Sequence, residues 1–407
     1  MKLGLVMTTR NRPAFAAANI RSILNQNGDF VLVVSDNSER AEDQDTLEKV
    51  CRNADDPRLM YIRPPQSLTM PRHWNWAMEQ ALATTDATHL GIQYDRRLWK
   101  PGAMRRLAAA VAAAPAMTTT YGWDIVFASE DHSVAGRLPA SGCLYAIRTS
   151  EVIERCSRAE IIELDQAYPA LANCIVPRNT FDRIRARFGN ICDSAIPDGS
   201  FLFRLCAIDD VFHHFDRALF IVYGYAHSNG WAYLRGDESG AWADWIKLWG
   251  DRPWIDAAPI PELKLGYNVM FHEYNLVRRV AGDRFPPIDH DRYLNHLGSG
   301  LANISDLKLR SEMRDVLKAH GWVEPAPQPP AVKPLYRRIL GPPARPLRHV
   351  ISAMKNKVRG RFGSGQTAVF ANDDDAVRYL LAHESTPDET YGQRLSLLHP
   401  VPVAFNG

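Results

Sequence analysis

Four short apolar runs in the first 94 residues limit the folds that this chain can adopt. The runs are Leu3–Met7, Phe30–Val34, Leu59–Ile62 and His89–Tyr94. A helical pattern over residues 13–24, with Pro13 in its first turn, follows the first run, and a second over residues 71–83 precedes the last. Strands that alternate with helices predict a parallel, doubly wound α/β sheet, whose ligands bind beyond the carboxyl ends of the strands.

Polar clusters follow three of these runs. They are Thr8, Thr9, Arg10, Asn11 and Arg12 after the first run, Asp36, Asn37 and Ser38 after the second, and Asp95, Arg96 and Arg97 after the fourth. The carboxyl ends of parallel strands share one edge of the sheet, so we expect the three clusters to meet there. Asp-Asn-Ser is also ordinary turn chemistry, and a purely structural role for that cluster stays open.

The order of these clusters resembles a known family. With Trp74-Asn75 in the second helical pattern and Leu-Trp-Lys-Pro-Gly-Ala over residues 98–103, the first 235 residues or so look like the inverting glycosyltransferases of family 2. The resemblance implies a GT-A fold, a Rossmann-like doubly wound mixed sheet flanked by helices. It also implies a nucleotide-diphosphate sugar donor, with a UDP-sugar favoured, and transfer to an acceptor hydroxyl with inversion at the anomeric carbon.

The same resemblance assigns donor contacts. Residues 8–12 would face the base, ribose or phosphates, and Asp36 would accept a hydrogen bond from a base-ring N–H, with Asn37 and Ser38 beside it. Asn75 would bond the donor, although the apolar residues around it in the sequence favour a helix that packs mainly into the core.

Asp198 holds the position of the catalytic base in this resemblance. It follows a Phe-Gly turn at residues 188–189 and opens the helical pattern after Pro197. Inverting transfer needs one carboxylate that takes the proton of the acceptor hydroxyl while its oxygen attacks the anomeric carbon. A helix cap is the plainer interpretation of an acid at this position, and the two roles are compatible.

The acidic cluster after the fourth run departs from the family pattern. The acid expected four residues before the proline is Arg97, and Arg96 precedes it, so only Asp95 remains. Mn²⁺ and Mg²⁺ prefer several hard oxygen ligands, which one carboxylate between guanidinium groups does not supply. Three interpretations stay open: Asp95 binds a metal together with His227, Arg96 or Arg97 replaces the cation at the diphosphate, or the site is catalytically silent.

These alternatives lead to different functions. The main expectation is a hexosyltransferase-type enzyme in envelope or extracellular polysaccharide or glycan synthesis, acting on a glycan or lipid-linked acceptor. The alternative from another class is a silent sugar-nucleotide-binding protein or assembly subunit. A nucleotidyltransferase fits less well, because the sequence shows no glycine-rich, lysine-bearing phosphate loop.

Composition favours a cytoplasmic protein. The chain has 407 residues, 46% hydrophobic content and a formal net charge of +2, which argues against a nucleic-acid partner. Its six cysteines form no C-x-x-C pair, so we expect reduced thiols. No run of about 20 apolar residues or signal peptide stands out in the sequence.

The pattern predicts four segments. They are a GT-A domain over 1–235, a helical extension packed on it over 236–324, a Pro-rich linker with a basic amphipathic segment over 325–372, and a C-terminal tail over 373–407. Within the third, residues 333–361 combine an apolar stripe with basic residues and no acids, which is typical of a helix lying on the inner face of a membrane. A basic tail on an acidic face of its own domain is the other interpretation.

Overall fold

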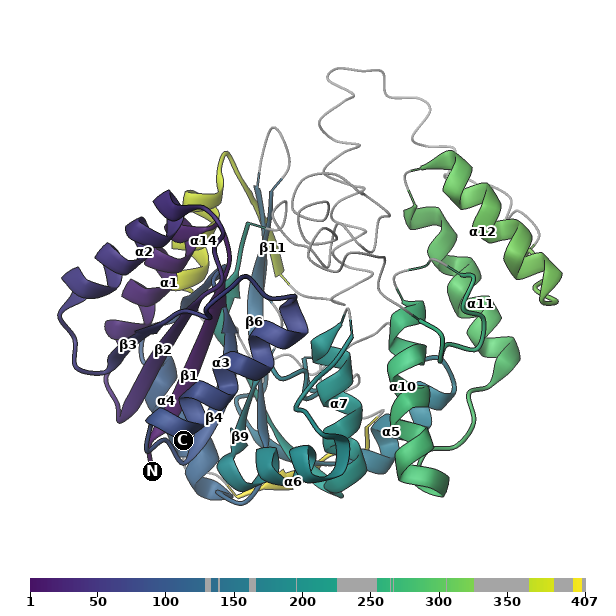
Figure 1. Cartoon of the computed structure of the whole chain (residues 1–407), viewed down its shortest axis with the longest axis horizontal. Helices are drawn as coiled ribbons and strands as arrows, with labels where there is room; N and C mark the ends of the chain where they lie inside the picture. Colours follow the sequence, from purple (N-terminus) through teal and green to yellow (C-terminus); the bar gives the residue numbers. More distant parts are fainter. Residues whose placement is uncertain are drawn as a thin grey trace, which may run out of the picture.

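A mixed twelve-stranded sheet forms the centre of the part of the chain that the structure describes (Figure 1). The structure is a computed structural model. It describes residues 1–128, 133–137, 140–160, 166–194, 196–224, 255–263, 265, 267–304, 306–325, 366–383 and 398–404. Helices cover both faces of the sheet, which confirms the predicted fold class.

The first half of the sheet is parallel. Strand β1 (Leu3–Thr9) lies between β2 (Phe30–Asp36) and β4 (His89–Tyr94), and β3 (Leu59–Ile62) pairs with the outer side of β2. The register places Thr9 opposite Asp36 and Thr8 opposite Tyr94. The carboxyl ends of these three strands therefore meet, as the sequence predicts.

Helices α1 (Pro13–Leu24), α2 (Ala41–Ala54) and α3 (Met70–Thr84) flank this parallel half. Every residue of β1 and β2 is buried, as expected of strands covered on both faces. Neighbouring residues enter different cores, because side chains alternate along a strand. Leu5 packs with residues of α1, whereas Val6 packs with residues of α3.

The second half of the sheet is mixed. It continues from β4 through β9 (Cys174–Pro177), β6 (Thr119–Ala128), β10 (Val211–Val222) and β8 (Leu144–Arg148). Strands β4 and β9 are antiparallel and come very close, since a Cβ on Gly91 would lie 2.1 Å from the carbonyl oxygen of Cys174. The short β5 (Arg97–Trp99) pairs with the end of β10 and leads to α4 (Ala103–Ala113).

A group of helices packs beside the mixed half, along the bottom and right of Figure 1. They are α5 (Thr149–Ser157), α6 (Arg178–Phe188), α7 (Pro197–Ile208), α10 (Asn268–Ala281), α11 (His290–Gly300) and α12 (Leu307–Ala319), with 3-10 turns η2 (Gly282–Arg284) and η3 (Leu301–Asn303). One hydrophobic cluster joins α5, α7 and α10–α12. Within it the rings of Phe203 and Tyr274 lie 5.4 Å apart, so α10 packs directly on α7.

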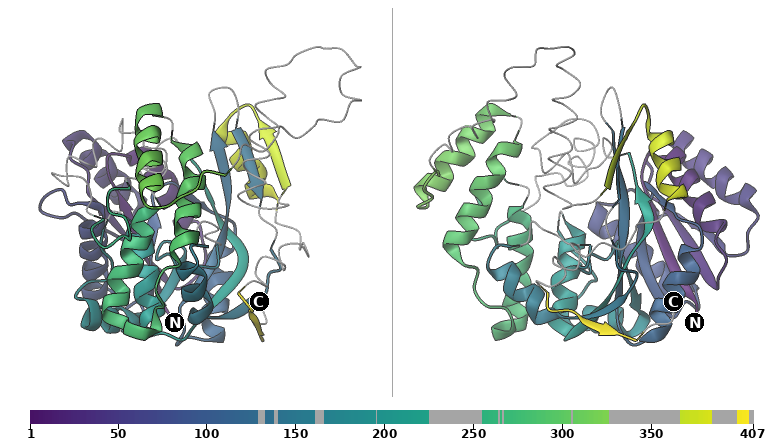
Figure 2. Two further views of the ribbon diagram at one scale, coloured as in Figure 1. Left: turned by 90° about the vertical axis from the view of Figure 1, so that its right-hand side faces the viewer. Right: turned by 180° about the vertical axis from the view of Figure 1, so that it is seen from behind.

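The C-terminal residues return to the sheet, as the yellow elements of Figure 2 show. Strand β11 (Gln366–Phe370) pairs with β7 (Ser133–Arg137), which itself pairs with β6, and β12 (Val401–Val403) pairs with β8. Helix α14 (Asp373–Ala382) covers apolar residues of β6, β7 and β10. The boundary predicted at residue 372 thus falls between β11 and α14, which contact each other.

Two sequence predictions fall on parts that the structure does not describe. The amphipathic segment over 333–361 and His227 both lie outside the described residues. Among the helices that are described, none is long and apolar enough to cross a membrane.

Candidate functional site

A buried carboxylate, Asp95, gathers polar groups at the carboxyl edge of the parallel strands. Its Oδ2 accepts a hydrogen bond from the Thr9 hydroxyl at 2.8 Å and lies 2.9 Å from Arg12 Nε. Arg96 Nε is 4.0 Å from the other oxygen, Oδ1. The Asp95 side chain is only 1% exposed, and a carboxylate so deeply buried requires such partners. Two guanidinium groups around one carboxylate leave the cluster positively charged.

The loop that carries Arg12 is locked to the loop after β2. Asn11 has a left-handed φ of 55°, a conformation that asparagine tolerates better than most residues, and it turns the chain from β1 into α1. Its backbone N–H donates to Ser38 Oγ at 2.8 Å, and its side-chain oxygen accepts from the Glu39 N–H at 2.9 Å. Arg10 forms an ion pair with Glu39 at 2.8 Å. The two predicted nucleotide loops are therefore one interlocked unit.

The cluster from Asp36 to Ser38 has extensive internal bonding. Asp36 Oδ1 accepts the Ser38 N–H at 2.9 Å, and Oδ2 accepts the Tyr61 hydroxyl at 3.0 Å. The Asn37 amide makes two bonds with the backbone of Leu68, at 2.8 and 2.9 Å. The hydrogen bonds of this segment within the protein are thus those of a structural turn. A carboxylate oxygen can accept more than one hydrogen bond, so donor binding by Asp36 stays a prediction.

Arg96 and Arg97 lie in different environments. Arg96 donates to the carbonyl oxygen of Gly224 at 3.0 Å and keeps its side chain near Asp95. Arg97 instead donates to Gln93 Oε1 at 3.2 Å and to the backbone carbonyl oxygen of Ala172. Its guanidinium carbon lies 4.1 Å from the centroid of the Phe220 ring, a cation–π distance. Arg96 therefore belongs with the Asp95 cluster, and Arg97 with the interior of the sheet.

Asp198 lies in the first turn of α7, which begins at Pro197. An acid there is favoured by the positive end of the helix dipole. The residue as a whole is half-buried, and its Oδ2 accepts a hydrogen bond from the Tyr94 hydroxyl. Burial raises the pKa of Asp198 to about 6, although the Tyr94 hydrogen bond and the charge of Arg97 act in the opposite direction. A carboxylate with a pKa close to neutral is suited to accept a proton.

Tyr94 contacts Asp198, although the sequence pattern identified it only as the last residue of a strand. It adjoins Asp95 in the chain, and its ring packs 5.6 Å from that of Trp74 and 4.3 Å from the guanidinium carbon of Arg97. The two consecutive side chains make contacts with different groups, Tyr94 with Asp198 and Asp95 with Arg12. An aromatic hydroxyl next to the acidic cluster is the only sequence signal that pointed to this role.

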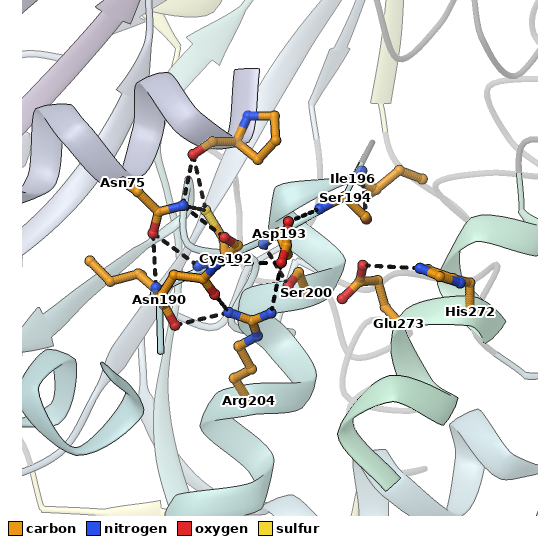
Figure 3. Close-up of polar contacts among 12 residues, drawn as sticks. Asn75, Asn190, Cys192, Asp193, Ser194, Ile196, Ser200, Arg204, His272 and Glu273 are labelled. Atoms are coloured by element: carbon orange, nitrogen blue, oxygen red, sulfur yellow. Dashed lines mark hydrogen bonds and ion pairs between the residues drawn. The ribbon is translucent and has the colours of Figure 1, made fainter. Parts of the chain in front are cut away.

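Asn75 holds the loop that leads to Asp198 (Figure 3). Its Oδ1 accepts from the Ile191 N–H at 2.8 Å, and its Nδ2 donates to the carbonyl oxygens of Cys192 at 2.7 Å and Pro71 at 2.8 Å. These bonds give Asn75 a structural role in this loop. A direct contact with a donor remains a prediction.

Among the described residues, no group of three or more histidine, cysteine or acidic side chains is placed to hold a metal ion. Of the predicted metal pair, only Asp95 lies in the described part of the chain, and its Oδ2 is bonded to Thr9 and Arg12. These described groups do not by themselves fit Mn²⁺ or Mg²⁺, which prefer several oxygen ligands.

The sequence matches no family model and no curated protein. The fold is similar to that of solved structures of Staphylococcus aureus TarS. For residues 1–349 of TarS the TM-score is 0.43 at 12% identity, with 79% of this chain and 91% of that chain covered. The TarS complex with UDP-GlcNAc gives 0.44 at 12% identity and the complex with UDP gives 0.44 at 13%, with the same coverage.

Proposed function

We propose that the protein is an inverting glycosyltransferase that uses a nucleotide-diphosphate sugar. One observation carries the proposal: two consecutive residues at the end of β4 connect a carboxyl group of pKa about 6 with a cationic cluster. Tyr94 bonds to Asp198, and Asp95 holds Arg12 with Arg96 beside it. A base and a phosphate-binding cluster at neighbouring points are what displacement of a diphosphate requires.

In the proposed reaction, Asp198 takes the proton of the acceptor hydroxyl. The acceptor oxygen forms its bond to the anomeric carbon from the face opposite the diphosphate. The bond between that carbon and the diphosphate oxygen breaks, and its electron pair leaves with the diphosphate. The guanidinium groups of Arg12 and Arg96 stabilise the charge that develops on that oxygen, because each can bond two phosphate oxygens.

The arginines therefore take the place of a divalent cation in this proposal. Support comes from the contacts of Asp95, which orients Arg12 at 2.9 Å and lies 4.0 Å from Arg96. Arginine keeps its charge at any working pH, so the cluster needs no metal to remain positive. The competing interpretation, a metal held by Asp95 and His227, predicts that chelation removes donor binding.

The finer parts of the proposal rest on the sequence. They are a UDP-sugar donor, transfer of a hexose to a glycan or lipid-linked acceptor, and a role in envelope or extracellular polysaccharide synthesis. The basic and apolar segment over 333–361 supports peripheral contact with the inner face of a membrane. Family 2 is the family that the order of the sequence motifs favours.

A calorimetric titration with UDP, GDP and dTDP compounds, in Mn²⁺ and in excess EDTA, tests the proposal. We expect a uridine compound to bind equally in both, with donor hydrolysis that Asp198→Asn eliminates while donor affinity stays unchanged. Asp182→Asn removes an exposed carboxylate of α6 and is the matched control. Binding without any turnover would instead favour the silent sugar-nucleotide-binding protein, and no binding would refute the assignment of the site.

A further inference from the structure

The loop over residues 190–194, which precedes α7, is held by several hydrogen bonds (Figure 3). Arg204 donates to the carbonyl oxygen of Asn190 at 2.9 Å and lies 3.8 Å from Asp193 Oδ2. The Asp193 N–H donates to Ser200 Oγ at 2.9 Å, and the Ser194 N–H donates to Asp193 Oδ1 at 3.0 Å. Ser194 has a left-handed φ of 53°, so the loop needs these contacts to keep its shape.

Glu273 of α10 closes this arrangement from the opposite side. Its side chain is 0% exposed, and neither carboxyl oxygen has a well-aligned hydrogen-bond partner among the described residues. The hydroxyl groups of Ser194 and Ser200 are its polar neighbours. Helix α10 leaves little room here, since a Cβ on Gly199 would lie 2.4 Å from the sulfur of Met270. A charged carboxylate in this position would destabilise the folded state, because its charge would be buried without a partner.

Among the described residues, the cationic side chains near Glu273 form no ion pair with it that would balance such a charge. His272 Nδ1 accepts the Ala257 N–H at 3.0 Å, so its ring is neutral, and its Nε2 lies 4.0 Å from Glu273 Oε1. Arg204 is engaged with Asn190 and Asp193.

The other ionisable groups of the described residues that face Glu273 are Asp193, whose charge opposes ionisation, and the Cys192 thiol. Burial raises the pKa of Glu273, and the two serine hydroxyls and Arg204 offset this only in part. The arrangement is therefore that of a carboxyl group that keeps its proton.

We propose that Glu273 is a positioning residue whose neutral carboxyl group donates its one proton to one of the two serine hydroxyls, accepts a hydrogen bond from the other, and fixes the loop before Asp198. The effect of Glu273 on catalysis rests on the proposed function, whereas the charge state of Glu273 does not. Glu273 does not contact the reacting atoms in this proposal. It acts through Ser194 and Ser200, one of which precedes Asp198 and the other of which follows it.

Thermal melting of the full chain across pH 4 to 9 tests the charge state. Unfolded glutamate titrates near its ordinary value of 4.5, whereas the folded protein holds the proton to higher pH. Wild-type protein should therefore lose stability through Glu273 as the pH rises above that value, and Glu273→Gln, which is neutral at every pH at this position, should not lose this contribution. We expect the melting temperature of the variant to gain on wild type as the pH rises. A difference that stays constant with pH overturns the proposal.

Turnover of the donor tests the positioning role. Glu273→Gln can still donate to the serine hydroxyls and should keep kcat close to wild type, whereas Glu273→Ala should lower kcat about tenfold or more with little change in donor KM. The alanine variant should also move the acid limb of the pH profile upward, because a looser loop weakens the Tyr94 bond to Asp198. Loss of kcat in the glutamine variant as large as in the alanine variant overturns the role.

Glu312→Gln is the matched control, because it removes an exposed carboxylate from α12. It should change neither the melting series nor the kinetics. If wild-type protein turns over no donor, the proposed function fails, and the melting series still decides whether Glu273 is neutral. The two failures are thus distinguishable.

Discussion

The carboxylates at the two ends of the candidate site face opposite surroundings. Asp95 is 1% exposed and is bonded to Thr9 and Arg12, with a second arginine nearby. Asp198 and Glu273 contact hydroxyl groups rather than forming an ion pair with an arginine, and burial raises the pKa of both. We infer that neighbouring cations, more than residue type, decide whether a buried acid serves as a fixed charge or as a group that exchanges protons.

The largest effect should come from removing the proposed proton acceptor, Asp198. Asp198→Asn keeps the shape of the side chain but cannot take a proton, so kcat should fall about 10²- to 10⁴-fold. Donor affinity, measured by calorimetry, should not change, because the proposed donor contacts lie at the Asp95 end. Full activity in this variant would place the base elsewhere and remove the contrast between the two ends.

Loss of the cations at the other end should have the next largest effect. Arg12→Ala removes the guanidinium group that Asp95 holds at 2.9 Å, and kcat should fall about 10²- to 10³-fold. Arg12→Lys should restore part of the loss, since lysine keeps the charge but not the two-pronged geometry. Steady-state assays in EDTA measure both variants, and Arg52→Gln on the exposed face of α2 is the control. A variant that loses activity only when Mn²⁺ is absent would return the role to a metal.

Stability should change in the direction opposite to activity at Asp198. Its ordinary pKa is 3.8, and the folded value is about 6. Ionisation of Asp198 therefore destabilises the folded state increasingly between these pH values, and the full destabilisation is reached above pH 6. Asp198→Asn avoids this cost and should be more stable than wild type at pH 7 by on the order of 1–3 kcal/mol. Below pH 4 the advantage should vanish. Urea unfolding at both pH values measures the difference, and an advantage that persists at low pH would mean that the cost does not arise from the charge.

Local patterns predicted the elements that carry the site. The bounds predicted for β3, β4 and α1 agree with the structure, because apolar runs and a proline in the first turn are signals within a few residues. Asp198 at the start of α7 was predicted from the proline before it together with the family resemblance. In each case the information lies beside the residue that it describes.

The links between elements could not be predicted in this way. Arg97 is buried because Phe220, more than 100 positions away, supplies a ring for its guanidinium group. The bond from Tyr94 to Asp198 spans 104 positions, and Glu273 comes from a helix whose contact with α7 no local pattern specifies.

The smallest effect should come from the bond that joins the two ends. The Tyr94 hydroxyl donates to Asp198 and lowers its pKa, while burial raises it to about 6. Tyr94→Phe keeps the ring against Trp74 but removes the donor, so the pKa of Asp198 should rise and the acid limb of kcat/KM should move upward by about one pH unit.

At pH 8 this variant should remain active, because Asp198 is ionised there with or without the hydrogen bond. Tyr379 lies on α14, and its hydroxyl accepts a hydrogen bond from Arg137 of β7. Tyr379→Phe should leave the pH profile unchanged. An acid limb that moves downward in Tyr94→Phe would mean that the hydroxyl opposes the charge of Asp198 instead of stabilising it. Tyr94 rather than burial would then raise the pKa of Asp198. The difference between the surroundings of Asp198 and Asp95 would have another cause.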